Sequence, residues 1–539
     1  MNVLILGAGL MQIPAILSAK ELGYRVCLVD ADDKAIAISK ADEFRKIDLK
    51  DKEGILQYAK SLQNGSGLAT VFTAGTDFSA SVSYVCQKLN LPSHTFDAAL
   101  NASIKTRMRK CFSDANVPSP KFYNLDKDNF TQDKLKEISS LIGFPLVVKP
   151  VDNMGARGCR MVRSLKEFEP AVKIAIEVSR SGNAIVEEYM DGPEYSIDAL
   201  VYNGTFTVTG FALRHIKYPP YFIETGHTMP AELDKSVHNQ LISVFALGAK
   251  ALGLEKGAAK ADIKFTKNGP MIGEIAGRLS GGYMSGWTYP YSSDLNLTKE
   301  ALLIACGKEP EELIKNRQKV DFETSELCKN ALQPYQLFEV KSKRVSAERA
   351  WMSIPGIVEE VKNITEEKIP YVKDFLPRTT VKLNCKVDFP RNNVQKCGNV
   401  ISLAEDRKLA VEAAQNAVSN VFIGLKANTR ETDDFLNFYT QDDEDNFPPS
   451  AFKSLSSQEL AQIEGFIPQN QKISDFIPSV LKTSDYKKEV DWSFNTISDI
   501  AAKFDILRPH HPKLNAQKFW KAVLRGGLQA AVYISDSEK

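Results

Sequence analysis

A lysine and a glycine-containing turn stand together in the stretch PLVVKPVDNMGARGCRMV. Lys149 ends an apolar run that predicts a strand, and Gly155 and Gly158 lie in the turn that follows. A lysine at the end of a strand can place its charge on phosphate oxygens, and loop amides can close over the same phosphates. The chain has no G-x-x-x-x-G-K-[ST] motif, so this would not be a P-loop. Taken alone, a surface lysine at a hairpin is the commoner explanation.

Two carboxylates and an arginine follow further along the chain. Asp262 and Glu274 lie on two predicted strands joined by Asn268-Gly269, a dipeptide typical of β-hairpins, and Arg278 comes four residues after Glu274. Facing carboxylates can hold Mg²⁺ against nucleotide phosphates, and an arginine can bind a carboxylate or an acyl phosphate. Each carboxylate could instead pair with a neighbouring lysine. The order of lysine, glycine loop, paired carboxylates and arginine favours a phosphate site.

The elements that must position these residues form an α/β and α+β multidomain fold. Residues 1–97 alternate short apolar strands with helical patterns, which predicts a parallel, Rossmann-like α/β domain. Residues 98–310 combine helices with alternating strands typical of antiparallel sheets, and include predicted helices at 102–116 and 235–252. A separate α+β piece is expected at 325–425. An acidic linker and a mostly helical extension are expected at 430–539.

Composition excludes several classes of partner. The 68 basic and 67 acidic residues leave a net charge of +1, which gives no field for nucleic acid or an anionic membrane surface. No stretch approaches the roughly 20 apolar residues of a membrane span, and the N-terminus lacks the basic region of a signal peptide. Eight scattered cysteines without a C-x-x-C pair suit reduced thiols. We therefore expect a cytoplasmic protein without nucleic-acid or membrane partners.

The N-terminus carries most of a dinucleotide-binding fingerprint. An apolar strand leads into Gly7-x-Gly9, a helical pattern follows, and a second apolar run ends on Asp30. The third glycine of the fingerprint, which allows close packing of helix and strand, is replaced by Gln12. An NAD-dependent oxidoreductase therefore stays a minor alternative, and it leaves residues 98–310 unexplained.

Taken together, these motifs resemble the ATP-grasp superfamily of carboxylate–amine ligases. The resemblance covers roughly residues 1–425, with a C-terminal domain similar to that of biotin carboxylases. It implies a pre-ATP-grasp domain at 1–97, and an ATP-grasp domain at 98–310 whose lid spans about 120–190. The implied cofactors are ATP and Mg²⁺ or Mn²⁺. The residues implied to contact ATP are Lys105, Lys149, Gly155, Gly158, Glu187, Tyr189, Met190 and Glu194. The implied metal ligands are Asp262 and Glu274.

The resemblance also implies a division of roles. Lys105 and Lys149 would neutralise phosphates, Glu187 and the backbone of Tyr189–Met190 would hold adenine, and Glu194 would contact the ribose. The glycine loop would close as a lid. Many members of the superfamily have an asparagine where this chain has Ala276, so water would replace a third protein ligand to the metal.

The stretch YFIETGHTMPAEL narrows the resemblance. Glu224 and His227, ahead of Pro230, resemble the E-x-G-H-x-x-P segment of bacterial L-amino-acid ligases. In such enzymes these residues line the amino-acid site, and an arginine at the place of Arg278 holds the substrate carboxylate or the intermediate. The catalytic residues implied for this chain are Arg278, Lys149 and His227, although a loop histidine without a role is an alternative for His227.

The expected reaction is amide or peptide bond formation through an acyl phosphate, with release of ADP. The expected partners are a small-molecule carboxylate and an amine, and a homodimer is an open arrangement. A biotin-carboxylase-like, carbamoyl-phosphate-synthase-like or purine-pathway enzyme remains an alternative with the same core. A non-catalytic nucleotide-binding module is a minor alternative.

Overall fold

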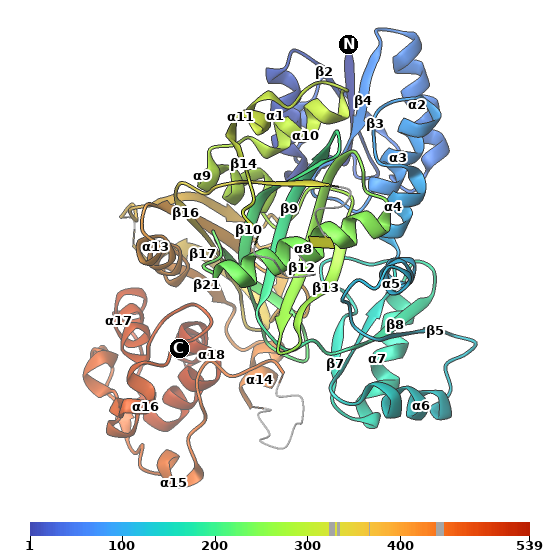
Figure 1. The fold of residues 1–539 in the computed structure, drawn as a ribbon. Helices are drawn as coiled ribbons and strands as arrows, with labels where there is room; N and C mark the ends of the chain where they lie inside the picture. Colours follow the sequence, from blue (N-terminus) through green and yellow to red (C-terminus); the bar gives the residue numbers. More distant parts are fainter. Residues whose placement is uncertain (323–328, 331–334, 366, 438–446, 539) are drawn as a thin grey trace. The chain divides into compact units, whose positions relative to one another are not determined.

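A computed structural model describes residues 1–322, 329–330, 335–365, 367–437 and 447–538. The chain forms two compact units, and each is described by itself (Figure 1). The first consists of Met1–Met154, Gly158–His215 and His227–Ser346, and the second of Gly155–Arg157, Ile216–Gly226 and Ala347–Lys539. Part of the predicted acidic linker, residues 438–446, lies outside the described residues, as does most of the stretch 323–334.

The first unit begins with the predicted parallel sheet. Its four strands run in the order β3-β2-β1-β4, and all neighbours are parallel. The strands are β1 (Asn2–Leu6), β2 (Arg25–Asp30), β3 (Glu43–Lys46) and β4 (Leu68–Phe72). The connecting helices are α1 (Ile13–Glu21), α2 (Lys52–Asn64) and α3 (Ser79–Lys88). Because parallel strands end at the same edge, this sheet brings the loops after β1 and β4 together.

Gln12 fills the space behind the first glycine loop. Its side chain is buried, donates to the Thr73 hydroxyl at 3.3 Å and accepts from the Ala74 backbone N–H at 2.9 Å. Asp30 accepts from the Ala8 backbone N–H at 2.7 Å, so this carboxylate holds its own loop. The residues of the incomplete fingerprint are therefore used within the protein, which supports the ranking of NAD as a minor alternative.

Residues 122–188 form a smaller antiparallel sheet. Its order is β5-β8-β6-β7, and the helices α6 and α7 pack on it through a core that includes Leu135, Phe168 and Val186. The strands are β5 (Phe122–Asp126), β6 (Leu146–Pro150), β7 (Arg160–Val162) and β8 (Asn183–Glu188). The helices are α6 (Gln132–Ile142) and α7 (Leu165–Val178). This sheet corresponds to the segment predicted as a lid.

A larger antiparallel sheet carries the predicted hairpin. The strands β13-β12-β9-β10 are neighbours in that order, and Figure 1 shows α8 lying across them. The strands are β9 (Glu194–Tyr202), β10 (Thr205–Lys217), β12 (Gly257–Thr266) and β13 (Gly269–Ala276), and the helix is α8 (Lys235–Leu252). Phe245 and Ile275 are among the fully buried residues between helix and sheet. The predicted helix at 235–252 and the hairpin at Asn268-Gly269 are confirmed.

The helix predicted at 102–116 is wrong in one respect, because it is two helices. The helix α4 (Phe96–Ser103) ends before Ile104, whose backbone is extended, and α5 (Lys105–Asp114) begins directly afterwards. The break lets the Lys105 backbone N–H donate to the Val151 carbonyl at 3.2 Å. The break therefore fixes the start of α5 beside the segment that follows β6.

Short elements complete the first unit. These are α9 (Tyr289–Ser293), α10 (Leu297–Ala305), α11 (Glu311–Asn316), β14 (Arg317–Lys319) and β15 (Gln336–Val340). β15 runs parallel to β10 and pairs with β14 on its other side.

The second unit joins the predicted C-terminal domain and extension through one hydrophobic core. Trp351 and Phe422 from the former share this core with Phe504 and Trp520 from the latter. Its strands include β17 (Gly356–Asn363), β18 (Val372–Pro377), β19 (Lys386–Val387), β20 (Gly398–Ala404) and β21 (Val421–Leu425). Its helices include α13 (Arg407–Ser419), α14 (Arg430–Asn437), α17 (Ile497–Leu507) and α18 (Ala516–Ser537). The division into four domains stays a prediction.

Two further expectations concern the whole chain. The seven cysteines among the described residues are all free thiols. Within those residues, no helix is both long and apolar enough to cross a bilayer.

Candidate active site

Three predicted site residues line one cavity in the first unit. Lys105 at the start of α5, Glu274 on β13 and Arg278 after β13 face a cavity of about 230 Å³. Asp77, from the loop after β4, lines the same cavity. The loop after β4 and the β12–β13 hairpin thus line one cavity.

The two predicted metal carboxylates stand directly opposite each other. Asp262 on β12 pairs in register with Glu274 on β13, so both side chains leave the same face of the hairpin. Glu274 accepts no side-chain hydrogen bond or ion pair from the residues that the structure describes, and it lines the cavity. This carboxylate is therefore available to a cation.

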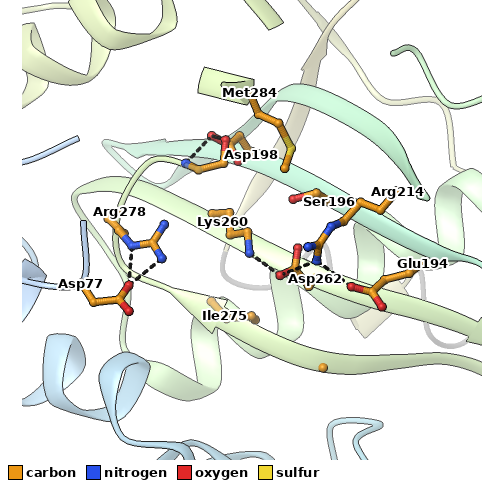
Figure 2. A network of polar contacts seen from close by, with 12 residues as sticks. Asp77, Glu194, Ser196, Asp198, Arg214, Lys260, Asp262, Ile275, Arg278 and Met284 are labelled. Carbon is orange, nitrogen blue, oxygen red and sulfur yellow. Dashed lines mark hydrogen bonds and ion pairs between the residues drawn. The ribbon is translucent and has the colours of Figure 1, made fainter. Parts of the chain in front are cut away.

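Asp262 sits in a chain of ion pairs (Figure 2). Lys260 donates to its Oδ2, and Arg214 Nη1 lies 2.9 Å from the same oxygen. Arg214 also contacts Glu194 at 2.6 Å, so it bridges the predicted metal and ribose carboxylates. Burial alone would raise the pKa of Asp262, but Arg214 and Lys260 lower it to about 2. The pairing of Asp262 with a neighbouring lysine, which the sequence left open, is therefore found.

The carboxylate pair fits a hard divalent cation. Asp262 Oδ1 is buried and has no hydrogen-bond partner among the described residues, so it retains an acceptor that a cation could use. Carboxylate oxygens are the ligands that Mg²⁺ prefers. Within the described ranges no cluster of three or more His, Cys, Asp or Glu side chains forms. Asp262 and Glu274 are therefore the two carboxylates that could hold the ion.

Lys149 on β6 and Glu187 on β8 form a buried ion pair in the smaller sheet. Lys149 Nζ donates to Glu187 Oε2 at 2.6 Å, and Arg109 Nε donates to Glu187 Oε1 at 2.7 Å. Glu187 is 1% exposed. Burial opposes its charge, but Arg109 and Lys149 lower its pKa to about 2. The two residues predicted to hold phosphate and adenine are therefore direct neighbours, and Arg109 holds Glu187 from the other side.

The predicted adenine segment is tied to the hairpin. Lys264 Nζ donates to the Met190 carbonyl at 3.1 Å and lies 5.2 Å from the centre of the Tyr189 ring. Burial lowers the pKa of Lys264, although the nearby Glu194 opposes this shift. Lys264 thereby connects β12 to the segment that joins β8 and β9.

The glycine loop and the E-x-G-H segment are divided between the units. Gly155 belongs to the second unit, where its carbonyl accepts from the Asn393 backbone N–H at 3.0 Å, and Gly158 belongs to the first. Glu224 belongs to the second unit, where its backbone N–H donates to Asn393 Oδ1 at 2.8 Å. His227 belongs to the first unit, and its Nε2 lies 2.8 Å from the Thr288 hydroxyl.

His227 and Glu224 are both strand residues of β11 (Ile223–Met229), and both are buried. The alternative of His227 as a loop histidine is therefore wrong about its position. Its role stays a prediction.

Several residues of the site carry no motif of their own in the sequence. Asp198 on β9 is fully buried and accepts from both the backbone N–H and the hydroxyl of Ser280 at 3.0 and 2.9 Å. Burial raises the pKa of Asp198 to about 7. Asp77 had a signal, because it ends the stretch TAGTD at the carboxyl end of a predicted parallel strand. Arg109 and Arg214 had none, since an arginine inside a helix or strand is ordinarily a surface residue.

A family comparison matches this part of the chain. Residues 142–286, which span most of the smaller sheet and the β12–β13 hairpin, fit the family model described as an ATP-grasp domain. This part of the chain is an ATP-grasp domain. The predicted resemblance to the ATP-grasp superfamily and the predicted multidomain α/β fold are confirmed. The assignment of individual residues in this ATP-grasp protein stays a prediction.

Related proteins include ligases of amino acids. Carnosine synthase 1 of Gallus gallus is 24% identical over 337 residues, which cover 57% of this chain and 35% of that protein. Alanine–anticapsin ligase of Bacillus subtilis (strain 168) is 25% identical over 260 residues, which cover 44% of this chain and 53% of that protein. This ATP-grasp chain thus spans about half or less of these relatives.

A solved structure shares the fold over a larger part. The L-amino acid ligase from Bacillus licheniformis superposes with a TM-score of 0.63 at 19% identity, covering 79% of this chain and 99% of that one. At this identity the likeness establishes the fold alone.

Proposed function

We propose that this ATP-grasp protein is an ATP- and Mg²⁺-dependent carboxylate–amine ligase that acts on amino acids or similar small acids. The observation that carries the proposal is the shared cavity of Lys105, Glu274 and Arg278, with Asp262 opposite Glu274 on the hairpin. The names of the relatives support an amino-acid substrate. Cytoplasmic location, small-molecule partners and a homodimer are part of the same proposal.

The reaction has two steps. A carboxylate oxygen of the acid attacks the γ-phosphorus of ATP, the bond from that phosphorus to the bridging oxygen breaks, and ADP leaves. The amine nitrogen then attacks the acyl carbon of the acyl phosphate, and phosphate and a proton are released. Such chemistry depends mainly on positioning and on stabilising negative charge.

The chain's own residues would divide this work. Lys105 and Lys149 neutralise phosphate oxygens, Glu187 and the Tyr189–Met190 backbone hold adenine, and Arg278 stabilises the oxyanion at the acyl carbon. Mg²⁺, held by Asp262 and Glu274, would screen the charge of the phosphates.

ADP release tests the proposal. The assay contains ATP, Mg²⁺ and panels of amino acids, singly and in pairs, with bicarbonate as a separate arm. We expect ADP that depends on an amino acid and phosphate formed in equal amount. Pyrophosphate in place of ADP would rule out the acyl phosphate, and ADP with bicarbonate alone would favour the biotin-carboxylase-like alternative. ATP binding without turnover would favour the non-catalytic module.

A further inference from the structure

We propose that Asp77 binds the α-ammonium group of an amino acid whose carboxylate lies against Arg278. The inference rests on the proposed function, and it specifies the acid that is activated as an α-amino acid. Asp77 and Arg278 both line the cavity in the first unit, and they form an ion pair with each other (Figure 2).

Only one of the two carboxylate oxygens of Asp77 accepts hydrogen bonds from Arg278. Arg278 donates from Nε at 2.9 Å and from Nη2 at 2.6 Å, and both hydrogen bonds go to Asp77 Oδ1. The other oxygen, Oδ2, accepts no hydrogen bond from the described parts of the chain. The Asp77 side chain is 26% exposed and lines the cavity. Oδ2 can therefore accept a hydrogen bond from a bound cationic group.

The guanidinium group of Arg278 also keeps N–H donors that could bind an anion. Its remaining nitrogen, Nη1, donates to the Leu279 carbonyl at 2.9 Å. A guanidinium group has five N–H donors, so two are left for an anion. The pair thus presents an anionic acceptor beside cationic donors. An α-amino acid presents the complementary charges, an ammonium and a carboxylate joined through one carbon.

The other two carboxylates that line the cavity, Asp152 and Glu274, have other roles. Asp152 accepts from the backbone N–H groups of Arg180 and Ser181 through its two oxygens, so it holds the turn before β8. Glu274 is a proposed metal ligand. Asp77 is therefore the lining carboxylate that remains for an ammonium group. The volume of about 230 Å³ greatly exceeds what one water needs, so a small organic molecule fits.

The loop that carries Asp77 is fixed against the loop that carries Arg278. A Cβ built on Gly75 would stand 2.9 Å from the Gly281 Cα, so the two backbones touch. The hydroxyls of Thr73 and Thr76 are 2.7 Å apart within the first loop. Burial opposes the charge of Asp77, but Arg278, together with Lys105 and Lys260, lowers the pKa of Asp77, so the group is ionised at neutral pH. A rigid, charged acceptor suits recognition of an ammonium group.

A purely structural role of Asp77, which would only orient Arg278, makes a different prediction. Loss of orientation would weaken all carboxylic acids equally, whether or not they carry an α-amino group. Loss of an ammonium contact would weaken only the amino acids. The ratio of the affinity for an amino acid to the affinity for the matching acid without an α-amino group therefore separates the two explanations.

The experiment compares paired ligands on the full chain. Binding of L-alanine against propionate and of L-phenylalanine against 3-phenylpropionate is measured by calorimetry, in the presence of Mg²⁺ and a non-hydrolysable ATP analogue. The variants are Asp77→Asn, which keeps the shape of the side chain, and Asp33→Asn, which changes an exposed carboxylate in the turn after β2 that pairs with Lys46. In the wild type and in Asp33→Asn we expect at least one amino acid to bind about 10- to 100-fold more tightly than its partner acid. In Asp77→Asn this preference should fall to near unity.

Two results would overturn the inference. One is wild-type protein that binds the acids without an α-amino group as tightly as the amino acids, or binds no amino acid. The other is an equal loss for both members of each pair in Asp77→Asn. ADP release in the same samples tests the proposed function separately, because an amino acid can bind at Asp77 even where no acid is phosphorylated.

Discussion

Lys149 donates a 2.6 Å hydrogen bond to Glu187, so the predicted phosphate-binding lysine and the predicted adenine-binding acid form one buried ion pair. To reach a phosphate, Lys149 must exchange this partner for the nucleotide. Glu187 would stay charged during the exchange because Arg109 contacts its other oxygen at 2.7 Å. The pair therefore gives Lys149 and Arg109 separable roles, which mutations can distinguish.

Lys149→Met should remove phosphate stabilisation and leave Glu187 paired with Arg109. We expect kcat/KM for ATP to fall by at least 100-fold, comparable to the loss of one donor to a transition-state oxyanion, at about 3 kcal/mol. The matched variant Arg109→Met leaves Lys149 held by Glu187, so its main effect should be on stability, at about 3 kcal/mol for a broken buried pair. Steady-state kinetics and thermal unfolding check both. Near-normal turnover of Lys149→Met would contradict the assigned site.

The metal site makes a prediction about Mg²⁺ concentration. Glu274→Gln removes a cavity carboxylate that accepts no side-chain hydrogen bond or ion pair from the described residues, so we expect the half-saturating Mg²⁺ concentration to rise by at least tenfold without loss of thermal stability. Asp262→Asn should raise it too, but it also leaves Arg214 and Lys260 without their shared acceptor and should lower stability. Asp128→Asn, which changes an exposed residue in the turn after β5, is the control. Unchanged Mg²⁺ dependence in Glu274→Gln would place the metal elsewhere.

The sequence predicted elements whose periodicity is strong and motifs whose order is informative. The helix at 235–252 and the hairpin at Asn268-Gly269 follow from local patterns, which short-range physics decides. The break at Ile104 was missed because nothing in the local sequence disfavours a continuous helix there. The break is accompanied by a hydrogen bond from the Lys105 backbone N–H to the carbonyl of Val151, which lies 46 positions away.

In the candidate site, too, residues in local motifs could be predicted and residues that depend on distant partners could not. Lys149, Asp262 and Glu274 could be found because each stands in a motif with a characteristic spacing. Asp77 ends a recognisable stretch, but neither it nor Arg109 or Arg214 could be assigned a role, because the partners of these side chains come from distant segments. The pairing of Lys149 with Glu187 was also beyond the sequence, since an ion pair depends on side-chain geometry.

The contact between Gly75 and Gly281 should tolerate no side chain. A Cβ on Gly75 would stand 2.9 Å from the Gly281 Cα and 3.3 Å from the Ser280 carbonyl oxygen, and backbone atoms cannot move aside independently. Gly75→Ala should therefore destabilise the protein by about 1–3 kcal/mol and lower activity, because it displaces Asp77 from Arg278. Gly9→Ala is the control, since a Cβ there meets nothing within 4 Å. Equal melting temperatures and activities for the two variants would refute this packing.

Asp198 should make the stability of the protein fall as pH rises. In the folded state Asp198 holds its proton up to a pKa of about 7, whereas the ordinary pKa of an exposed aspartate is 3.8. Between these two values the folded chain binds more protons than the unfolded chain, so the free energy of unfolding decreases with pH, by up to about 1.4 kcal/mol per pH unit. Well above pH 7 both states are ionised and the effect is complete.

Asp198→Asn removes this titration and keeps the shape of the side chain. Its amide oxygen can still accept from Ser280, and its NH₂ group replaces the acid proton at Oδ1, an atom without a partner among the described residues. The melting temperature of Asp198→Asn minus that of the wild type should therefore increase steadily between pH 5 and 7 and level off at higher pH. The corresponding difference in the free energy of unfolding should increase by up to about 1.4 kcal/mol per pH unit. Thermal unfolding at half-unit pH steps measures this, with Asp128→Asn as the control that should run parallel to the wild type. A constant difference between Asp198→Asn and the wild type would mean that Asp198 is already ionised in the folded protein, held by Lys260 and Arg278 rather than by its proton.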